Sequence, residues 1–315
     1  MQQQKIEFRK QRDFSSVLGD SFKFLKQNFK TFFSSIILIV GPFILLMGLC
    51  YAYMQTTVMT NITSDPTNPL GMFNVTYFLS IGALVLFGII SNILLSSVVY
   101  NYLVLYNEKP FGEKITVSEV GKRLWSNIGS LIISTIVFLL TFVVLITIMV
   151  LIGIGITSML GVAGGVLVGL SIFATVIIFA PVMYYFIPAA FYVVVRDRIF
   201  IFPAMVKVRK YLSGNFWWTW LIMVVVLIGL AILQTIFNLP ASIMAMMSMF
   251  SRMKTPGVED TSSGANMLLM AFYTLGMFLT HCTSSISHLI SAFNFMSHEE
   301  NHEGKGLMSR LDEIK

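Results

Sequence analysis

The sequence has few charged residues, and they leave long stretches of the chain with none. Of its 315 residues, 11% are charged and 56% are hydrophobic, which lies outside the range of ordinary soluble domains. No polar segment is long enough to form a separate soluble domain with its own core. This composition argues against an enzyme whose chemistry takes place in a water-soluble domain.

Cysteine is also scarce, and a cleavable leader is not evident. Cys50 and Cys282 are the only two cysteines, and both fall within apolar stretches, which excludes a disulfide framework. The first apolar run begins only at residue 32, after a charged lead, and is longer than the core of a signal peptide. We therefore expect no cleaved signal peptide.

The usual motifs of catalysis and coupled transport are missing as well. The sequence has no Walker motif, no dinucleotide fingerprint and no Asp, Glu, Lys or Arg inside its long apolar stretches. Ion-coupled transport normally relies on such intramembrane charges. We predict a protein that is not an enzyme and that needs no cofactor.

The apolar stretches themselves predict an all-α integral membrane protein. Crossing ~30 Å of hydrocarbon takes ~20 helical residues, and six stretches are long enough. The predicted transmembrane helices are residues 32–54, 74–104, 129–153, 163–195, 216–249 and 266–295.

Loop charge predicts how these helices are oriented. Of the 21 Lys and Arg residues, 19 fall in the two terminal segments and in alternate loops, and only Arg252 and Lys254 fall on the opposite side. Because basic loops stay in the cytoplasm, both termini should be cytoplasmic. The net charge of +6 then reflects this topology and attraction to anionic lipid, with no nucleic-acid partner.

A short motif containing Lys, Leu and Asn recurs before alternate apolar stretches. Its copies are KFLKQNFKTFF at 23–33, KRLWSNIGSLI at 122–132 and KYLSGNFWWTW at 210–220. Each follows an amphipathic, basic segment, which is typical of a helix lying in the membrane interface. In each copy we expect the chain to turn into the membrane at the Asn, since Asn tolerates the left-handed conformation and caps helices. These corner residues are Asn28, Asn127 and Asn215.

The recurrence predicts three parallel repeats, each an interfacial helix followed by a two-span hairpin. The predicted divisions are a cytoplasmic tail at 1–13, repeats at 14–106, 107–195 and 196–296, and a second cytoplasmic tail at 297–315. The basic residues of the interfacial helices should contact lipid headgroups or partner proteins. They are Lys23, Lys26, Lys122, Arg123, Lys207, Arg209 and Lys210.

The segment FPAMVKVRKYLSGNFWWTW at 202–220 carries a resemblance to a known family. This pattern of amphipathic helix, Asn and Trp corner, and hairpin resembles the membrane domain that precedes some bacterial glycerophosphodiester phosphodiesterases, and related stand-alone inner-membrane proteins. The resemblance implies a multi-pass protein of the bacterial cytoplasmic (inner) membrane, within a larger assembly. The enzymatic activity is not implied, because no phosphodiesterase domain follows in this sequence.

Two sets of polar residues are candidates for chemistry. HEENH at 298–302 matches the H-E-x-x-H zinc motif, with His298 and His302 as ligands and Glu299 as base. Polar neighbours and the following EGKG favour a solvated helix end instead, so we predict no metal site. His281 and His288 lie inside a predicted span, ~10 Å apart along the helix; hydrogen bonding between helices is the plain explanation, and a proton site the alternative.

We therefore predict a non-catalytic multi-pass subunit or scaffold of an inner-membrane assembly. Its basic interfacial helices would bind anionic lipid, other membrane or cytoplasmic subunits, or a second copy of the chain. A transporter or lipid-handling protein is the first alternative, and an intramembrane metalloprotease using the HEENH motif is the second.

Overall fold

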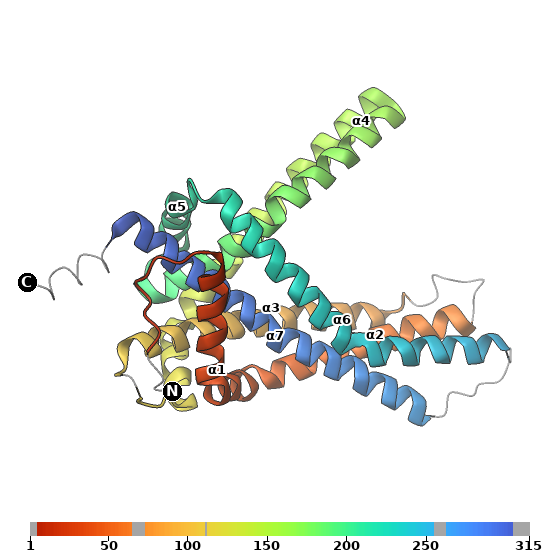
Figure 1. Ribbon diagram of the computed structural model, residues 1–315. Coiled ribbons are helices and arrows are strands. Elements are labelled where there is room, and N and C mark those ends of the chain that lie inside the picture. The colour runs from red at the N-terminus through yellow and green to blue at the C-terminus, as the bar shows by residue number, and fades with distance from the viewer. Residues whose placement is uncertain (1–4, 65–72, 111, 255–262, 305–315) are drawn as a thin grey trace, which may run out of the picture. The chain divides into compact units, whose positions relative to one another are not determined.

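The structure, a computed structural model, describes residues 5–64, 73–110, 112–254 and 263–304. These residues form helices and no strands, which confirms the predicted all-α class (Figure 1). The helices are α1 (Phe14–Ile39), α2 (Gly41–Ser64), α3 (Val75–Glu108), α4 (Val117–Asp197), α5 (Ile201–Leu212), α6 (Phe216–Lys254) and α7 (Ser263–Glu303).

Several of these helices are long and apolar enough to cross a membrane. Among the described residues α3, α4, α6 and α7 each meet that description, and α1 with α2 forms a fifth candidate, bent by 60° at the break between them. Their lengths exceed the ~20 residues that a bilayer requires. These four or five candidate spans agree with the predicted multi-pass membrane protein, and the predicted count of six spans stays a prediction.

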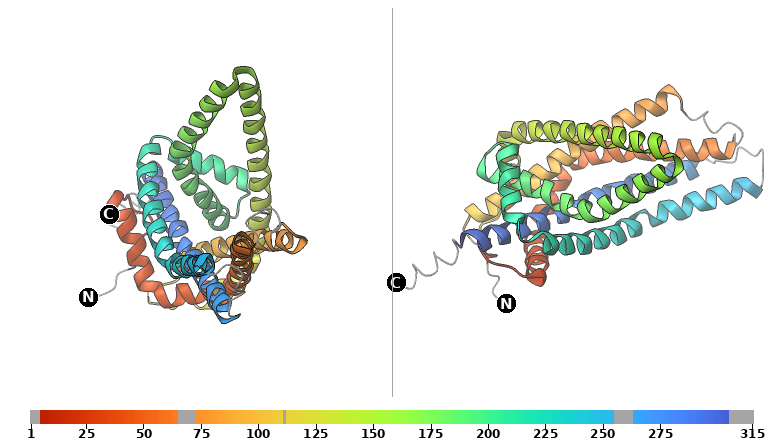
Figure 2. Two further views of the ribbon diagram at one scale, coloured as in Figure 1. Left: turned by 90° about the vertical axis from the view of Figure 1, so that its right-hand side faces the viewer. Right: turned by 90° about the horizontal axis from the view of Figure 1, so that it is seen from above.

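Helix α4 is interrupted at a glycine. Its 81 residues would extend ~120 Å if they were straight. The backbone at Gly161 leaves the helical region, with φ 59° and ψ −140°, a conformation that glycine adopts without a side-chain clash. Beyond it the chain returns: a methyl group built at Gly153 would lie 3.3 Å from Val168 Cγ1. Figure 2 shows the two limbs that result.

A tryptophan of α6 donates a hydrogen bond to a carbonyl that a proline in the second limb of α4 leaves without its helical donor. Pro181 has no N–H, so it leaves the carbonyl of Ile177, four residues earlier, without its usual helical donor. The indole Nε1 of Trp220 donates a hydrogen bond to that oxygen at 3.1 Å. This contact fixes the start of α6 against the second limb of α4.

The chain divides into two compact units. The first comprises residues 1–32, 96–227 and 286–315, and the second comprises 33–95 and 228–285. The predicted repeat 107–195 lies wholly within the first unit, whereas 14–106 and 196–296 each contribute to both. The threefold repeat organisation stays a prediction.

The core of the first unit holds the N-terminal segment in place. Phe8 stacks on Tyr106 with ring centroids 5.6 Å apart and meets the edge of Phe293 at 5.5 Å. The backbone N–H of Arg12 donates to Ser297 Oγ at 2.9 Å. The start of the described chain and the end of α7 therefore lie together.

In the second unit, helices cross at small residues. A methyl group built at Gly48 of α2 would lie 3.1 Å from Thr274 Cγ2 of α7, and one at Gly276 would lie 2.7 Å from Asn238 Oδ1 of α6. Asn238 Nδ2 also donates to Thr280 Oγ1 at 3.2 Å. Close backbone approach with polar bridging is typical of helix packing in membranes.

The structure corrects two of the three predicted Asn corners. Helix α1 continues through Asn28, whose Nδ2 donates to the Phe24 carbonyl at 3.0 Å. Helix α4 begins at its Thr116 cap and continues through Asn127, so the segment expected to form a separate interfacial helix before Asn127 forms the first turns of α4 instead. Only Asn215 lies between two helices, after Gly214 with φ 87°. Asn215 Nδ2 also donates to the carbonyl four residues earlier, that of Tyr211, at 3.3 Å, so the neighbouring Gly214 is what distinguishes this corner from Asn28.

Candidate functional site

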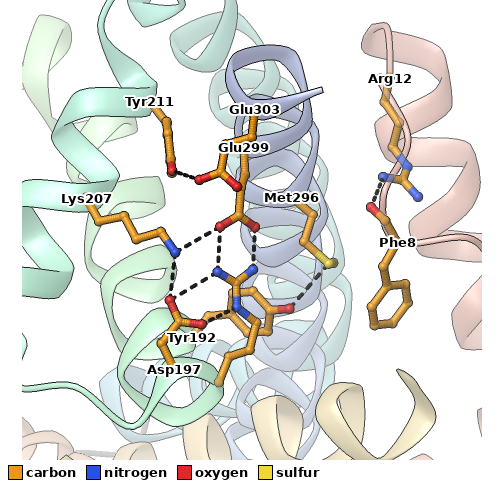
Figure 3. Close-up of polar contacts among 10 residues, drawn as sticks. Phe8, Arg12, Tyr192, Asp197, Lys207, Tyr211, Met296, Glu299 and Glu303 are labelled. Carbon is orange, nitrogen blue, oxygen red and sulfur yellow. Dashed lines mark hydrogen bonds and ion pairs between the residues drawn. The ribbon is translucent and has the colours of Figure 1, made fainter. Parts of the chain in front are cut away.

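A compact ionic cluster lies where α4 ends, within the first unit (Figure 3). The guanidinium of Arg196 contacts both oxygens of Glu299, at 2.5 and 2.7 Å, and its Nε donates to Asp197 at 2.7 Å. The ammonium of Lys207 bridges the same two carboxylates, at 2.7 Å to Asp197 and 3.0 Å to Glu299. Two cations and two anions therefore balance each other.

Three helices bring these four residues together. Helix α4 supplies Arg196 and Asp197, and Arg198 then adopts a left-handed φ of 56° that ends the helix. Helix α5 buries Ala204 and Val208, which leaves Lys207 at the edge of the buried face. The four ionic side chains are 18–26% exposed, so solvent screens their interactions only in part.

Aromatic rings pack against the Arg196 side of the cluster. The Arg196 guanidinium lies over the rings of Tyr192 at 5.3 Å and Phe295 at 5.4 Å, an arrangement that favours a cation. Burial opposes the charge on Lys207, but its bonds to Asp197 and Glu299 outweigh burial and raise the pKa of Lys207. Burial and the Glu303 carboxylate, which accepts a hydrogen bond from the Tyr211 hydroxyl, raise the pKa of Tyr211.

An open pocket of about 950 Å³ lies beside this cluster. Its lining includes five carboxylates and four cations, together with a few apolar residues. The lining residues are Lys5, Ile6, Glu7, Phe8, Arg9, Asn107, Tyr192, Arg196, Asp197, Lys207, Met296, Glu299, Glu300 and Glu303. Pockets for drug-like ligands are mostly apolar, so this one suits water and ionic solutes better.

The N-terminal segment forms one wall of the pocket, and buried Arg12 holds it there. The Arg12 side chain is 0% exposed, and its Nε pairs with Asp20 at 2.8 Å. Its Nη1 donates to the carbonyls of Phe8 and Lys10, each at 3.1 Å. Figure 3 shows Phe8 and Arg12 across from the ionic cluster. Arg12 therefore joins the backbone of this segment to Asp20 of α1.

The three residues of the predicted zinc motif face different partners. His298 Nε2 shares a 2.9 Å hydrogen bond with Thr219 Oγ1, Glu299 belongs to the ionic cluster, and the exposed His302 lies against the Tyr211 ring at 5.4 Å. Across the described ranges, no three His, Cys, Asp or Glu side chains are grouped to hold one metal ion.

The other predicted polar residues are separated between the units. His288 lies in the first unit, where its Nδ1 shares a 2.8 Å hydrogen bond with the Tyr100 hydroxyl. His281 lies in the second unit, partly buried. Asn127 donates to Asn101 Oδ1 at 2.9 Å, so this Asn joins two helices.

Five of the seven predicted docking cations are exposed: Lys23, Lys26, Lys122, Arg209 and Lys210. The other two form ion pairs within the protein, and docking by all seven stays a prediction. Arg123 pairs with Glu108, with Nη2 2.8 Å from Oε1, and Lys207 lies in the ionic cluster. Both sit opposite a carboxylate from another part of the fold, which the sequence pattern does not reveal.

Large aromatic side chains stand exposed beside the exposed cations. Phe22 is 53% exposed and Phe29 60%, on the same stretch of α1 as Lys23 and Lys26. Trp125, 71% exposed, follows Lys122 by one helical turn, and Trp217, 67% exposed, begins α6 shortly after Lys210. We call these three stretches, 22–30, 122–125 and 206–218, the basic-aromatic faces. Aromatic rings with neighbouring cations are typical of the membrane–water interface.

The ionic cluster and the Arg12 anchor were not identified from the sequence. Arg196 and Glu299 are 103 positions apart, and no local spacing connects them. Only one feature of the sequence points to the cluster: Arg196 and Asp197 directly follow a stretch without charged residues. Burial of an unpaired charge there would cost free energy, so a partner is expected.

No protein-family model, no curated protein and no solved structure matches this chain. The geometry of the described residues is therefore the basis for assigning a function.

Proposed function

We propose that this protein is a non-catalytic multi-pass scaffold of a bacterial cytoplasmic membrane assembly, held by anionic lipid at its basic-aromatic faces and docking partner subunits there. The chain would cross the membrane six times: once by the bent pair α1 and α2, once each by α3, α6 and α7, and twice by the limbs of α4. Both termini would be cytoplasmic, as the distribution of Lys and Arg predicts.

The observation that carries this proposal is the pairing of exposed cations with exposed aromatic rings. A solvated charged face has no need of a half-exposed Phe or Trp beside each Lys, and such apolar exposure is unfavourable in water. At a membrane interface the rings reach the headgroup level, and each nearby Lys or Arg adds about 1 kcal/mol of attraction to anionic lipid. The resemblance of residues 202–220 to an inner-membrane family favours the same location.

Lipid binding can be tested with the Lys residues of α1. The triple variant Lys23→Gln, Lys26→Gln, Lys30→Gln removes three cations from the first basic-aromatic face. We expect its affinity for phosphatidylglycerol, measured by native mass spectrometry from nanodiscs, to fall by about 100-fold. A matched control removes three exposed cations outside these faces: Lys10, Lys114 and Arg198. Equal losses in both variants would mean that net charge alone determines lipid binding.

The subunit role has its own test. Gentle extraction from native membranes, followed by size-exclusion chromatography and mass spectrometry, should recover a stoichiometric partner protein. Partner binding should weaken when Trp125 and Trp217 are replaced by Ala. A lone monomer with no co-eluting protein would contradict the scaffold proposal while leaving lipid binding intact.

A groove in the second unit favours lipid handling as a second candidate. This groove, of about 610 Å³, lies between α2 and α7 and is lined almost wholly by apolar side chains: Leu45, Leu49, Met267, Met270, Ala271, Thr274, Leu275 and Phe278. Its size and lining suit an acyl chain. Recovery of one bound lipid per chain, lost on Ala271→Trp, would support this role, whereas recovery of the lipid with that variant would oppose it.

A further inference from the structure

Three buried polar atoms near the ionic cluster lack hydrogen-bond partners. Tyr185 OH, Asn294 Oδ1 and His298 Nδ1 find none among the residues that the structure describes. Tyr185 and Asn294 are 0% exposed and His298 is 2% exposed. Buried polar atoms in folded proteins are nearly always paired with protein or with ordered water, so three at one place call for an explanation.

Within the first unit, Thr219 joins Asn294 to His298, and the Tyr185 ring packs against His298. Thr219 Oγ1 shares a 2.9 Å hydrogen bond with His298 Nε2 and accepts one from Asn294 Nδ2 at 3.4 Å. The Tyr185 ring meets the His298 ring edge-on, with centroids 6.0 Å apart. Asn294 and His298 are four residues apart on α7, so their side chains lie on the same face.

We propose that Tyr185, Asn294 and His298 hold an internal water molecule. A bound water commonly makes about three hydrogen bonds to polar groups that would otherwise be unsatisfied. Here it would accept from the Tyr185 hydroxyl and donate to Asn294 Oδ1 and to His298 Nδ1. That assignment leaves the proton of a neutral His298 on Nε2, where it donates to Thr219.

Two residues that line the polar pocket are close in sequence to residues of the proposed water site. Tyr192, which lines the pocket, follows Tyr185 by two turns on α4, a rise of ~10 Å. Glu299, which also lines the pocket, is the next residue after His298. The proposed water site and the polar pocket are therefore formed by neighbouring residues of the same two helices, α4 and α7.

Radiolytic labelling of the intact protein tests the occupant directly. Synchrotron exposure in H₂¹⁸O generates hydroxyl radicals from internal water, and these label adjacent side chains even when bulk solvent cannot reach them. Tyr100 is the matched control, because it is also 0% exposed but its hydroxyl is paired with His288 at 2.8 Å. We expect ¹⁸O incorporation at Tyr185 several-fold faster than at Tyr100; equal rates would overturn the proposal.

Unfolding temperatures give a second, independent readout. If the site is dry, Tyr185→Phe removes an unsatisfied hydroxyl and raises Tm. If water is bound, the same change removes one of its partners and lowers Tm by about 2 °C. Asn294→Leu should then lower Tm as well. The double variant Tyr185→Phe, Asn294→Leu should lower Tm by less than the sum of the two single changes, because both act through one water molecule. A rise in Tm, or simple additivity, would contradict a bound water.

Discussion

Removing Glu299 should destabilise this protein far more than removing an exposed carboxylate. Glu299 is 18% exposed and contacts both Arg196 and Lys207, so Glu299→Gln leaves two partly buried cations with only Asp197 as counter-ion. Breaking a buried ion pair from one side lowers the free energy of unfolding by about 3–5 kcal/mol. Partial exposure places this site at the lower end, about 3 kcal/mol.

The matched control is Glu113→Gln, because Glu113 pairs with Lys109 at 2.8 Å but is 52% exposed. Exposed pairs contribute about 0–1 kcal/mol. Thermal unfolding in detergent, at about 2 °C per kcal/mol for a chain of this size, should show a loss near 6 °C for Glu299→Gln and no more than about 2 °C for Glu113→Gln.

A double variant sharpens this comparison. Arg196→Met with Glu299→Met removes the pair together, while Lys207 and Asp197 remain bonded to each other at 2.7 Å. Replacement of a whole buried pair by apolar residues is often neutral or stabilising. We therefore expect the double variant to unfold at a higher temperature than Glu299→Gln. Equal losses for Glu299→Gln and Glu113→Gln would refute the reasoning that burial makes this cluster strong.

Three further predictions concern single positions. Gly161→Ala should lower stability by about 1–3 kcal/mol, because φ is 59° and ψ −140° there. Gly155→Ala, with open space around it, should not lower it, and circular dichroism melts would compare the two variants. Gly276→Ala should lower Tm, because its new Cβ would lie 2.7 Å from Asn238 Oδ1, and an unchanged Tm would mean that Asn238 can move. The pKa of Lys207 is raised above its ordinary value of 10.5. Its contribution to the stability of the fold is therefore complete below pH 10.5 and is lost as pH rises through the higher folded pKa. Lys207→Gln should weaken this alkaline loss of stability, measured by urea unfolding at several pH values.

The positions of the long helices could be predicted because hydrophobicity along the chain is a local property. The predicted stretch 74–104 corresponds to α3, and 216–249 to α6. The corner at Asn28 was wrong because a residue suited to a cap can also bond within its own helix, and propensity does not decide between the two. The structure shows that choice through the bond from Asn28 to Phe24.

The candidate site was less predictable, since it depends on which distant helices meet. The sequence analysis considered Lys207 and Glu299 separately, Lys207 as a lipid or partner contact and Glu299 only as the base of a zinc motif that it then rejected. Each assignment depended on neighbouring residues alone, while the 3.0 Å contact between them brings together α5 and α7. Charged residues at the ends of apolar helices can form ion pairs with one another, as Lys207 and Glu299 do here.

Labelling of single cysteines tests the membrane topology most directly. In a chain whose Cys50 and Cys282 are replaced by Ser, Met159→Cys lies next to the Gly161 break at a position 87% exposed, and Lys114→Cys lies exposed before α4 begins. A maleimide that cannot cross membranes should label position 159 in intact cells and position 114 only after permeabilisation. Labelling of both positions from the same side would contradict the proposal that the limbs of α4 cross the membrane.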